Sequence, residues 1–381
     1  MISDLLVLEL AGVLAGPSVG MFFAEHGARV VKVEPPSGDV TRRWHLPTED
    51  PSDDRPAYFC AVNWGKESVV LDLKTADGRA ALHRLVLEAD VVISAFRPGA
   101  AHGLKADAET LRALNPRVIV LEVEGYGSGD DRAGYDAVVQ AESGFMALNG
   151  HAEGPPTKMP IALVDVLAGH HLKEAALVAL LERERTGLGA TVRVSLLGAA
   201  VSSLANQASN WLTAGVAPRR KGSAHPNIAP YGRPYATADG DVILAVGTDR
   251  QFAALTDVLG LEVAPSWATN AGRVRDRDAL DRALEAALAT RTRESLLTDL
   301  EGRGVPAGAV LEVEDVFAHP EAARLVVRDG SHAAVRTVAT GAARPLSAPP
   351  MLGEHTRSIL GPDAVTCGLE ADHQSGRQKT G

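Results

Sequence analysis

The sequence has little cysteine, few aromatic residues, no excess of positive charge and no long apolar run, and each shortage excludes a class of protein. Two cysteines occur among 381 residues, Cys60 and Cys367, and neither belongs to a CxxC pair. A disulfide framework and a thiolate zinc site are therefore excluded. No apolar stretch approaches the ~20 residues that span a bilayer. Residues 1–4 carry no basic charge ahead of the short apolar run 5–10, so no signal peptide is expected and the expected location is cytoplasmic.

The formal net charge is −10, from 38 basic and 48 acidic residues. This balance argues against broad attraction to nucleic acid or to anionic lipid, and is compatible with a local basic pocket. Apolar residues make up 45% and aromatic residues 4% of the chain, which indicates an ordinary globular protein with a core of Ala, Val and Leu. Its length corresponds to roughly two to three domains.

Short apolar segments alternate with helical patterns through the first 200 residues. The expected strands lie at residues 5–10, 28–33, 68–73, 90–96 and 117–123. Buried strands separated by helices of ten to fifteen residues imply right-handed βαβ crossovers. The predicted fold class is therefore α/β, with a doubly wound parallel sheet. Beyond it, a helix is expected from about residue 164 to 186, then a strand at 191–195 and one further helix continuing through Trp211.

Proline marks the expected boundaries between domains. Four prolines fall within residues 218–234, which we interpret as a linker. A smaller α/β unit is expected over residues 235–328, followed by a Pro-rich stretch at 345–353. Residues 367–381 are polar and are expected to form a flexible tail.

The turn after the first strand contains Gly12, Gly16 and Gly20, and Glu34 ends the second strand. Glycines at such a turn let the backbone approach a ligand, and an acid at the second strand suits a ribose. The spacing is GxxxGxxxG rather than GxGxxG, however, and small residues at this interval equally suit packing of a helix on a sheet. A dinucleotide site is therefore only an alternative.

Common hydrolase and metal motifs are missing. The sequence around Ser128 is not a GxSxG elbow, and no HExxH occurs. His170 and His171 are adjacent, so they point to different faces of a helix and cannot share a metal as an i, i+4 pair can. No metal site is expected.

Asp165 is a lone carboxylate in the apolar stretch 159–169. An aspartate that begins a helix needs no further function, because it can accept hydrogen bonds from the first backbone N–H groups. The same position also suits a nucleophile, since the helix dipole favours the ionised carboxylate and apolar walls exclude water. Both interpretations remain open from the residues alone.

Taken together, these segments resemble the class III coenzyme A-transferases, the formyl-CoA/carnitine-CoA transferase-like family of CaiB/BaiF type. The resemblance runs from about residue 5 to residue 360 and rests on motifs in the family order, at residues 8–17, 32–42, 63–73, 96–99, 134–144, 164–166 and 225–231.

The resemblance implies a doubly wound large domain built from both chain ends, residues 1–217 and 329–366, with the smaller domain 235–328 between them. It also implies an interlocked, ring-like homodimer without nucleic-acid or membrane partners. Coenzyme A and a carboxylic acid would be substrates, and no tightly bound cofactor is expected. Asp165 aligns with the catalytic aspartate, which would form an aspartyl anhydride and then an aspartyl-CoA thioester.

The resemblance further implies a set of residues that contact coenzyme A or lie near its thioester: Val13, Leu14, Ala15, Arg42, Lys66, Ala95, Phe96, Arg97, Tyr135 and Asp136. Ala95 stands where the family often has Asn, and Trp64 where a basic residue is common. The basic residue that often follows the Phe-Arg-Pro-Gly motif is also not evident in residues 100–105.

Three alternatives remain. The related 2-methylacyl-CoA racemases carry a His where this chain has Tyr135, and an ordinary tyrosine is a poor base at pH 7. A nicotinamide-dependent oxidoreductase is suggested only by the glycine turn and Glu34. A non-catalytic CoA-binding subunit would have no need of a shielded Asp165.

Overall fold

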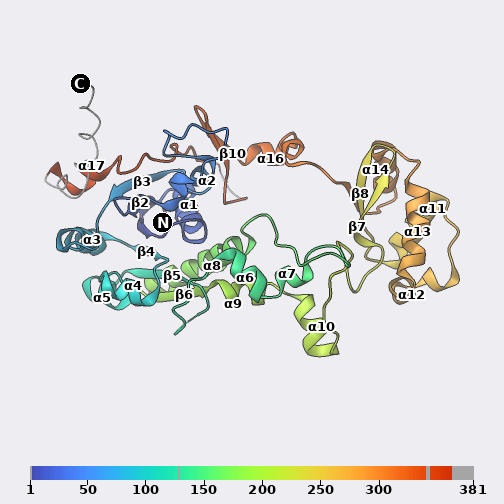
Figure 1. The fold of residues 1–381 in the computed structure, drawn as a ribbon, viewed down its shortest axis with the longest axis horizontal. Coiled ribbons are helices and arrows are strands. Elements are labelled where there is room, and N and C mark those ends of the chain that lie inside the picture. The colour runs from blue at the N-terminus through green and yellow to red at the C-terminus, as the bar shows by residue number, and fades with distance from the viewer. Residues whose placement is uncertain (1, 128, 340–343, 363–381) are drawn as a thin grey trace, which may run out of the picture. The chain divides into compact units, whose positions relative to one another are not determined.

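The computed structural model describes residues 2–127, 129–339 and 344–362, so the expected tail 367–381 lies outside the described residues (Figure 1). The chain divides into two compact units, each made from separate segments. The first unit comprises Met1–Ser143, Met159–Ala205 and Arg324–Gly381. The second comprises Gly144–Lys158 and Asn206–Ala323.

A six-stranded parallel sheet forms the centre of the first unit and confirms the predicted α/β class. The strand order is β3-β2-β1-β4-β5-β6. All neighbouring strands pair in parallel. The strands are β1 (Leu6–Leu10), β2 (Arg29–Glu34), β3 (Lys66–Val70), β4 (Val91–Ser94), β5 (Ile119–Glu124) and β6 (Thr191–Ser195). The order reverses between β1 and β4, so the loops after these two strands diverge and leave a crevice.

Helices connect these strands and begin at residues suited to capping. Thr75, Asp107 and Ser195 each accept a hydrogen bond from a backbone N–H in the first turn of the helix that follows. The helices are α1 (Ala15–Glu25), α2 (Ala57–Cys60), α3 (Ala76–Glu88), α4 (Pro98–Gly103), α5 (Ala108–Leu114), α6 (Asp136–Glu142), α8 (Leu163–Thr186) and α9 (Leu196–Ser202), with short 3-10 turns at η1 (Ile2–Asp4) and η2 (Val40–Arg43).

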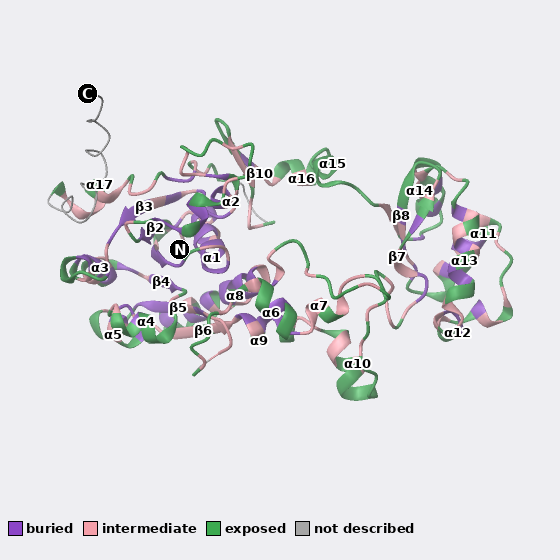
Figure 2. Ribbon diagram, viewed as in Figure 1, coloured by how far each residue is buried: buried purple, intermediate pink, exposed green. Residues whose placement is uncertain are grey.

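The apolar strands lie in the interior, and the helices cover them (Figure 2). Val7, Val92 and Ile93 are fully buried in the two central strands. Because both faces of a parallel sheet are covered, β1, β4 and β5 are mainly apolar, whereas β2 and β3 carry charged residues and β6 alternates. This explains why short apolar runs located the strands in the sequence.

The helices α1 and α8 approach closely where small residues meet. A Cβ atom placed on Gly169 would lie 2.4 Å from Ser18 Oγ and 3.3 Å from the carbonyl oxygen of Ala15. Glycine at residue 169 therefore sets the distance between the two helices.

The C-terminal segment returns to the first unit. It contains the hairpin β10 (Val326–Asp329) and β11 (His332–Val335), and the helix α17 (Thr356–Leu360). Val70 N of β3 donates to Thr356 Oγ1 at 3.0 Å, and the backbone N–H of Ser68 donates to the His355 ring. Residues far apart in the sequence thus complete one edge of the sheet.

The second unit has its own small antiparallel sheet and core. Its strands are β7 (Tyr231–Thr237), β8 (Gly240–Ala245) and β9 (Ala307–Ala309). Buried leucines of α13 and α14 pack with Tyr235 and Val242. The helices are α7 (Phe145–Leu148), α10 (Asn206–Ala214), α11 (Asp249–Leu259), α12 (Asn270–Arg275), α13 (Arg277–Leu288), α14 (Arg293–Gly302), α15 (Val313–Val316) and, at the boundary, α16 (Pro320–Arg324), with the 3-10 turn η3 (Pro265–Ala268).

Two local expectations differ from the structure. The helix expected to continue through Trp211 is broken into α9 and α10, because Ala205 takes a positive φ of 47° that no right-handed helix accommodates. Residues 218–234 belong to the second unit, and β7 already begins at Tyr231. Among the described residues, no helix combines the length and the apolar composition that crossing a membrane requires.

Candidate active site

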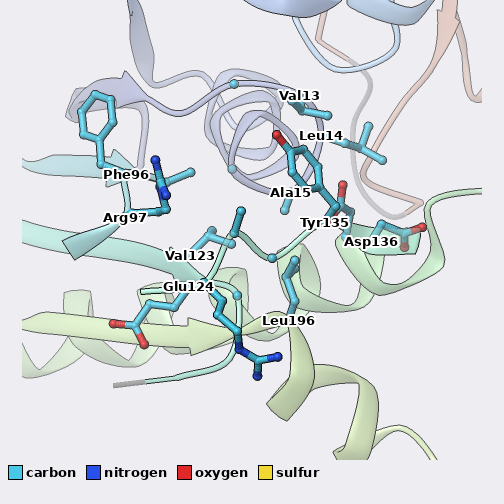
Figure 3. Close-up of a pocket in the computed structure, with 18 of the residues that line it drawn as sticks. Val13, Leu14, Ala15, Phe96, Arg97, Val123, Glu124, Tyr135, Asp136 and Leu196 are labelled. Atoms are coloured by element: carbon cyan, nitrogen blue, oxygen red, sulfur yellow. The ribbon is translucent and has the colours of Figure 1, made fainter. Parts of the chain in front are cut away.

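A cavity of about 380 Å³ lies at the carboxyl edge of the parallel sheet, where the strand order reverses. Its walls come from the segments that follow β1, β4, β5 and β6. Figure 3 shows Val13, Leu14 and Ala15 on one side of it and Val123, Glu124 and Leu196 on the other. Open α/β sheets commonly bind their ligands at this position.

The structure brings most of the expected site residues to this cavity. Those that line it are Val13, Leu14, Ala15, Ala95, Phe96, Arg97, Tyr135, Asp136 and Asp165. Arg42 and Lys66 do not line it, and both side chains are buried elsewhere.

Asp165 occupies the first turn of α8 and is buried, with a relative exposure of 8%. The helix begins after Ala162, whose side chain provides no cap. The N–H of Val164, immediately before Asp165, instead donates to Asp136 Oδ1 at 2.8 Å. A second carboxylate therefore holds the end of the helix that carries Asp165.

Two cations line the cavity, and they differ in availability. Arg132 pairs with Asp130 and Glu142 and stacks on the ring of Tyr126. Arg97 is exposed and forms no ion pair with any residue that the structure describes. Its guanidinium is thus available to an anionic ligand, and guanidinium groups bind phosphate well.

Beneath the turn that carries Val13 lies a buried ionic cluster, which we define as Glu9, Lys32, Glu34, Asp39, Arg42 and Lys66. Lys32 Nζ lies 2.8 Å from Glu9 and 3.0 Å from Asp39. Lys66 Nζ lies 2.7 Å from Glu9 and also donates to the carbonyl oxygen of Pro17 and to Asn63 Oδ1. The hydrogen-bonding capacity of both lysines is therefore used inside the protein.

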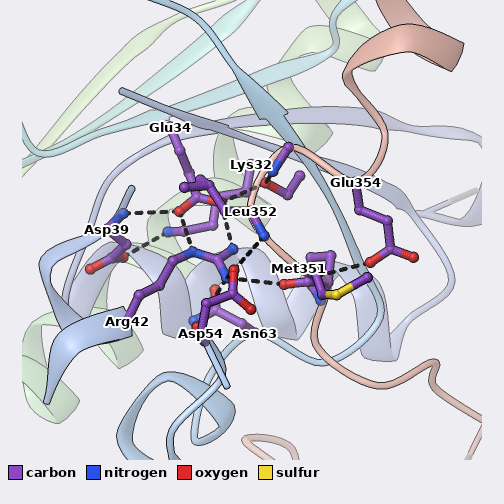
Figure 4. A network of polar contacts seen from close by, with 12 residues as sticks. Lys32, Glu34, Asp39, Arg42, Asp54, Asn63, Met351, Leu352 and Glu354 are labelled. Atoms are coloured by element: carbon purple, nitrogen blue, oxygen red, sulfur yellow. Dashed lines mark hydrogen bonds and ion pairs between the residues drawn. The ribbon is translucent and has the colours of Figure 1, made fainter. Parts of the chain in front are cut away.

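Arg42 is held in the same cluster, as Figure 4 shows. Its guanidinium forms two hydrogen bonds with Glu34 at 2.7 Å and reaches Asp54 and the carbonyl oxygen of Pro350. It also lies 3.9 Å from the centre of the Phe59 ring. With these contacts and 3% exposure, Arg42 joins the C-terminal segment to β2 and is not free to bind a ligand.

The surroundings shift the pKa values of these groups in opposite directions. Burial disfavours the charge of Lys32, but Glu9 and Asp39 outweigh burial and hold its pKa above the ordinary value. Burial dominates at Lys66 and lowers its pKa to about 8, although Glu9 opposes this. Burial raises the pKa of Glu34, but Arg42 and Lys32 reverse the effect and hold it below the usual value. Both lysines share Glu9, and their pKa values differ because Lys32 also has Asp39 and Glu34 nearby, whereas the charge of Lys32 adds to burial at Lys66.

The ionic cluster contacts the cavity wall through the first turn. The N–H of Val13 faces the Asp39 carboxylate at 3.3 to 3.4 Å, and Asp39 also accepts hydrogen bonds from Thr41. Val13 has a φ of 69°, which is unusual for a β-branched residue. Such strain persists only where the surroundings determine the backbone, so the cluster fixes the shape of the cavity wall.

A second cavity of about 280 Å³ adjoins the first, and Gly12 and Phe96 line both. It extends past the ends of β2 and β3 and includes Leu71, Leu73 and Lys74 in its wall. Lys74 is exposed and has no ion-pair partner within the described chain.

Several residues of the site were not expected from the sequence. Glu124, Arg132 and Leu196 line the first cavity. Glu124 is the last residue of β5 and could have been predicted from that position. No pattern in the sequence indicates Arg132. Burial, followed by the carboxylates of Asp165 and Asp136, raises the pKa of Tyr58, which places this phenol near the site.

No group of three or more His, Cys, Asp or Glu residues in the described part of the chain is arranged to hold a metal ion. His170 is exposed, and His171 contacts Ser202 Oγ at 3.1 Å.

Comparisons with known proteins agree with this geometry. The family model described as CoA-transferase family III matches residues 2–356. The succinate–glutarate CoA-transferase of Agrobacterium fabrum is 38% identical over 379 residues, which cover 94% of this chain and 94% of that protein. The acetyl-CoA:oxalate CoA-transferase of Acetobacter aceti is 36% identical, with coverage of 86% and 85%.

A solved structure shows the same fold. The crystal structure of a CaiB/BaiF family protein from Brucella suis matches with a TM-score of 0.83 at 40% identity, covering 94% of this chain and 98% of that one. The cavity at the sheet reversal and these relatives lead to one conclusion: the chain belongs to CoA-transferase family III and is a transferase of coenzyme A.

Proposed function

We propose that the chain moves coenzyme A from an acyl-CoA donor to a free carboxylic acid through covalent intermediates on Asp165. The observation that supports this most is the position of Asp165, buried in the first turn of α8 and lining the cavity at the carboxyl edge of the sheet. Carboxylates are weak nucleophiles towards thioesters, so an enzyme must hold one in place and exclude water. The 8% exposure of Asp165 and its place in a helix turn support both requirements.

In the first half of the reaction, the Asp165 carboxylate attacks the thioester carbonyl of the donor. The carbon–sulfur bond breaks, coenzyme A leaves as a thiolate, and a mixed anhydride remains on Asp165. The thiolate then attacks the aspartyl carbonyl of this anhydride. The donor acid leaves as a carboxylate, and Asp165 carries coenzyme A as a thioester.

The second half reverses these steps with the acceptor. The acceptor carboxylate attacks the aspartyl thioester, which releases the thiolate and forms a second anhydride. The thiolate then attacks the acceptor's acyl carbon, which yields the new acyl-CoA and restores the Asp165 carboxylate. No proton or electron is gained or lost over the cycle.

For coenzyme A, we propose a path along both cavities that meet at Gly12 and Phe96. The thioester end lies in the first cavity, near Asp165, and the nucleotide end lies towards the second. Arg97 and Lys74 face this path without ion-pair partners among the described residues. They are therefore the cations best suited to its phosphates. Arg42 and Lys66 support the turn from below.

For the acids, we propose short dicarboxylates as a substrate class. The two relatives named above are described as a succinate–glutarate and an acetyl-CoA:oxalate CoA-transferase, so three of the four acids in their names are dicarboxylic. Acceptor acids of equal chain length, one series with a single carboxylate and one with two, would distinguish monocarboxylic from dicarboxylic substrates. Transfer consumes only one carboxylate, so a preference for the second series reflects binding of the other.

A homodimer is also part of this proposal. Val178 and Leu181 of α8 are 56% and 68% exposed in the first unit, and Leu212 of α10 is 79% exposed in the second. Large exposed apolar side chains on helices indicate surfaces that a partner covers. We propose that this partner is a second copy of the chain. We also propose that both ends of the chain form the large domain. Light scattering coupled to size exclusion would show twice the mass of one chain.

Transfer is favoured over racemisation of the acyl group because Tyr135 lines the cavity and no histidine does so among the residues that the structure describes. Exchange of the α-proton with deuterium from solvent, without transfer, would reverse this preference.

The test is trapping of Asp165. After incubation with an acyl-CoA and no acceptor, we expect mass spectrometry to find coenzyme A or a hydroxamate on Asp165. Asp165→Asn should abolish both the adduct and transfer. Asp278→Asn is the matched control, because Asp278 lies in the first turn of α13 in the second unit, is exposed and lines neither cavity. Transfer by Asp165→Asn at the wild-type rate would overturn the proposal.

A further inference from the structure

Gln140 of α6 is completely buried, and each polar atom of its amide has a partner near the beginning of α8. Oε1 accepts a hydrogen bond from Met159 N at 2.9 Å. Nε2 donates to Asp136 Oδ2 at 2.8 Å and to the carbonyl oxygen of Ile161 at 3.3 Å. The amide orientation is fixed, because a flip would place an NH₂ group against the N–H of Met159.

These bonds lead directly to the nucleophile. Asp136 and Gln140 lie one turn apart on α6, so their side chains share a face of the helix. Asp136 uses one oxygen for Gln140 and the other for Val164 N, the residue before Asp165. Gln140 therefore holds both the segment that enters α8 and the carboxylate that caps it.

We propose that Gln140 is a positioning residue for Asp165, acting through Asp136 and residues 159–161; this rests on the nucleophilic role proposed above. Attack on a thioester depends on the direction of the carboxylate, and a displacement of about 1 Å can cost about 100-fold in rate. A buried amide with all its partners satisfied can impose that direction, since breaking any of its bonds leaves a buried polar group unpaired.

The arrangement allows an exchange experiment. In Gln140→Glu, two carboxylates face each other; in Asp136→Asn, two NH₂ groups do. In the double variant, the new amide at residue 136 can still accept from Val164 N and can donate to the new carboxylate at residue 140. That carboxylate can still accept from Met159 N. The pair is then compatible again, although Ile161 loses its donor and the negative charge moves from residue 136 to residue 140.

We expect each single variant to lower the single-turnover rate of coenzyme A release about 100-fold, while the dissociation constant for free coenzyme A changes less than twofold. The double variant should be at least tenfold faster than the slower single variant, because the two changes compensate. Gln251→Glu is the matched control: Gln251 belongs to the capping box of α11 in the second unit. It should leave the rate unchanged.

The outcomes separate the two proposals. If the wild type forms no adduct on Asp165, the nucleophilic role fails and the positioning role fails with it. If the wild type forms the adduct but both single variants form it as fast, only the positioning role is overturned. A double variant as slow as the product of the two single effects also overturns it. Thermal unfolding of each variant shows whether a slow rate reflects loss of the fold.

Discussion

Two groups of cations lie near the first turn and the two cavities, and they have similar side chains but differ in burial and in ion pairing. Below, Lys32, Lys66 and Arg42 are buried and fully paired with carboxylates and carbonyl groups. Above, Arg97 and Lys74 are exposed at the cavities and form no ion pair with described residues. A basic residue in a family motif can therefore serve the scaffold or the ligand, and burial distinguishes the two.

The largest expected effect comes from Glu9, the carboxylate shared by Lys32 and Lys66. Removing one partner of a buried ion pair typically costs about 3–5 kcal/mol, because the remaining charge is uncompensated. Glu9→Ala should lower the free energy of unfolding by about that amount in urea denaturation. Glu67→Ala is the control, since its partner Arg29 is exposed and such pairs contribute about 0–1 kcal/mol. Equal losses in the two variants would contradict the distinction.

The next effect concerns pH. The pKa of Lys66 is about 8 in the folded chain and 10.5 when unperturbed. Between these values the unfolded chain binds more protons, so stability rises with pH. We expect Lys66 alone to increase the free energy of unfolding by about 1–2 kcal/mol from pH 7 to pH 9.

Two lysine variants test this origin. Burial also lowers the pKa of Lys173 on α8 to about 8, so it contributes with the same sign. Lys66→Met and Lys173→Met should each remove part of the rise. An unchanged rise in Lys66→Met would show that the charge of this lysine does not titrate in the buried cluster.

A smaller effect is expected for Arg97, the exposed arginine that lines the first cavity. Arg97→Ala should weaken coenzyme A binding about tenfold, or about 1.4 kcal/mol, as measured by calorimetry. Its thermal midpoint should not change, because Arg97 forms no ion pair in the described structure. Arg42→Ala should instead lower the thermal midpoint, because it leaves Glu34 without its guanidinium. Arg84→Ala, at an exposed position of α3, controls for loss of one positive charge. A fall in the thermal midpoint of Arg97→Ala would remove the contrast.

The smallest effect is expected at Val13, which lies between the two groups of cations. Val13→Gly removes the penalty of a positive φ, about 1–2 kcal/mol, and increases the entropy of the unfolded chain by a similar amount, about 0.5–1 kcal/mol. The free energy of unfolding should therefore change by less than about 1 kcal/mol. A loss of several kcal/mol would show that the side chain, rather than the backbone, stabilises the turn.

Sequence patterns predicted the first unit well for a physical reason. The central strands β1, β4 and β5 are mainly apolar runs, and helices between strands begin at capping residues such as Thr75 and Asp107. The second unit was harder, because its strands are partly exposed and antiparallel. The break at Ala205 depends on a backbone angle that the sequence does not reveal.

The candidate site shows the same limit. Asp165 stood out because a carboxylate in an apolar stretch is unusual, and the structure places it in the cavity wall. The motif residues Arg42 and Lys66 gave no sign that they would be enclosed by Glu34 and Glu9. Lys66 and Glu9 are 57 residues apart and meet only because their strands join one sheet. Arg42 meets Glu34 because the short turn Val40–Arg43 folds back over the end of β2. Gln140 could be recognised only as part of the motif at residues 134–144. Its role depends on the backbone groups of Met159 and Ile161 and, through Asp136, on that of Val164.

The close contact of α1 with α8 at Gly169 has a consequence for how such enzymes diversify. The turn after β1 leads into α1, and Asp165 lies in the first turn of α8. The spacing of the two helices therefore sets the distance between the wall that we propose to bind coenzyme A and the nucleophile Asp165. Any side chain at residue 169 would collide with Ser18. New acid specificities can therefore arise by exchanging residues on the loops after β5 and β6, while the spacing of α1 and α8 stays constant.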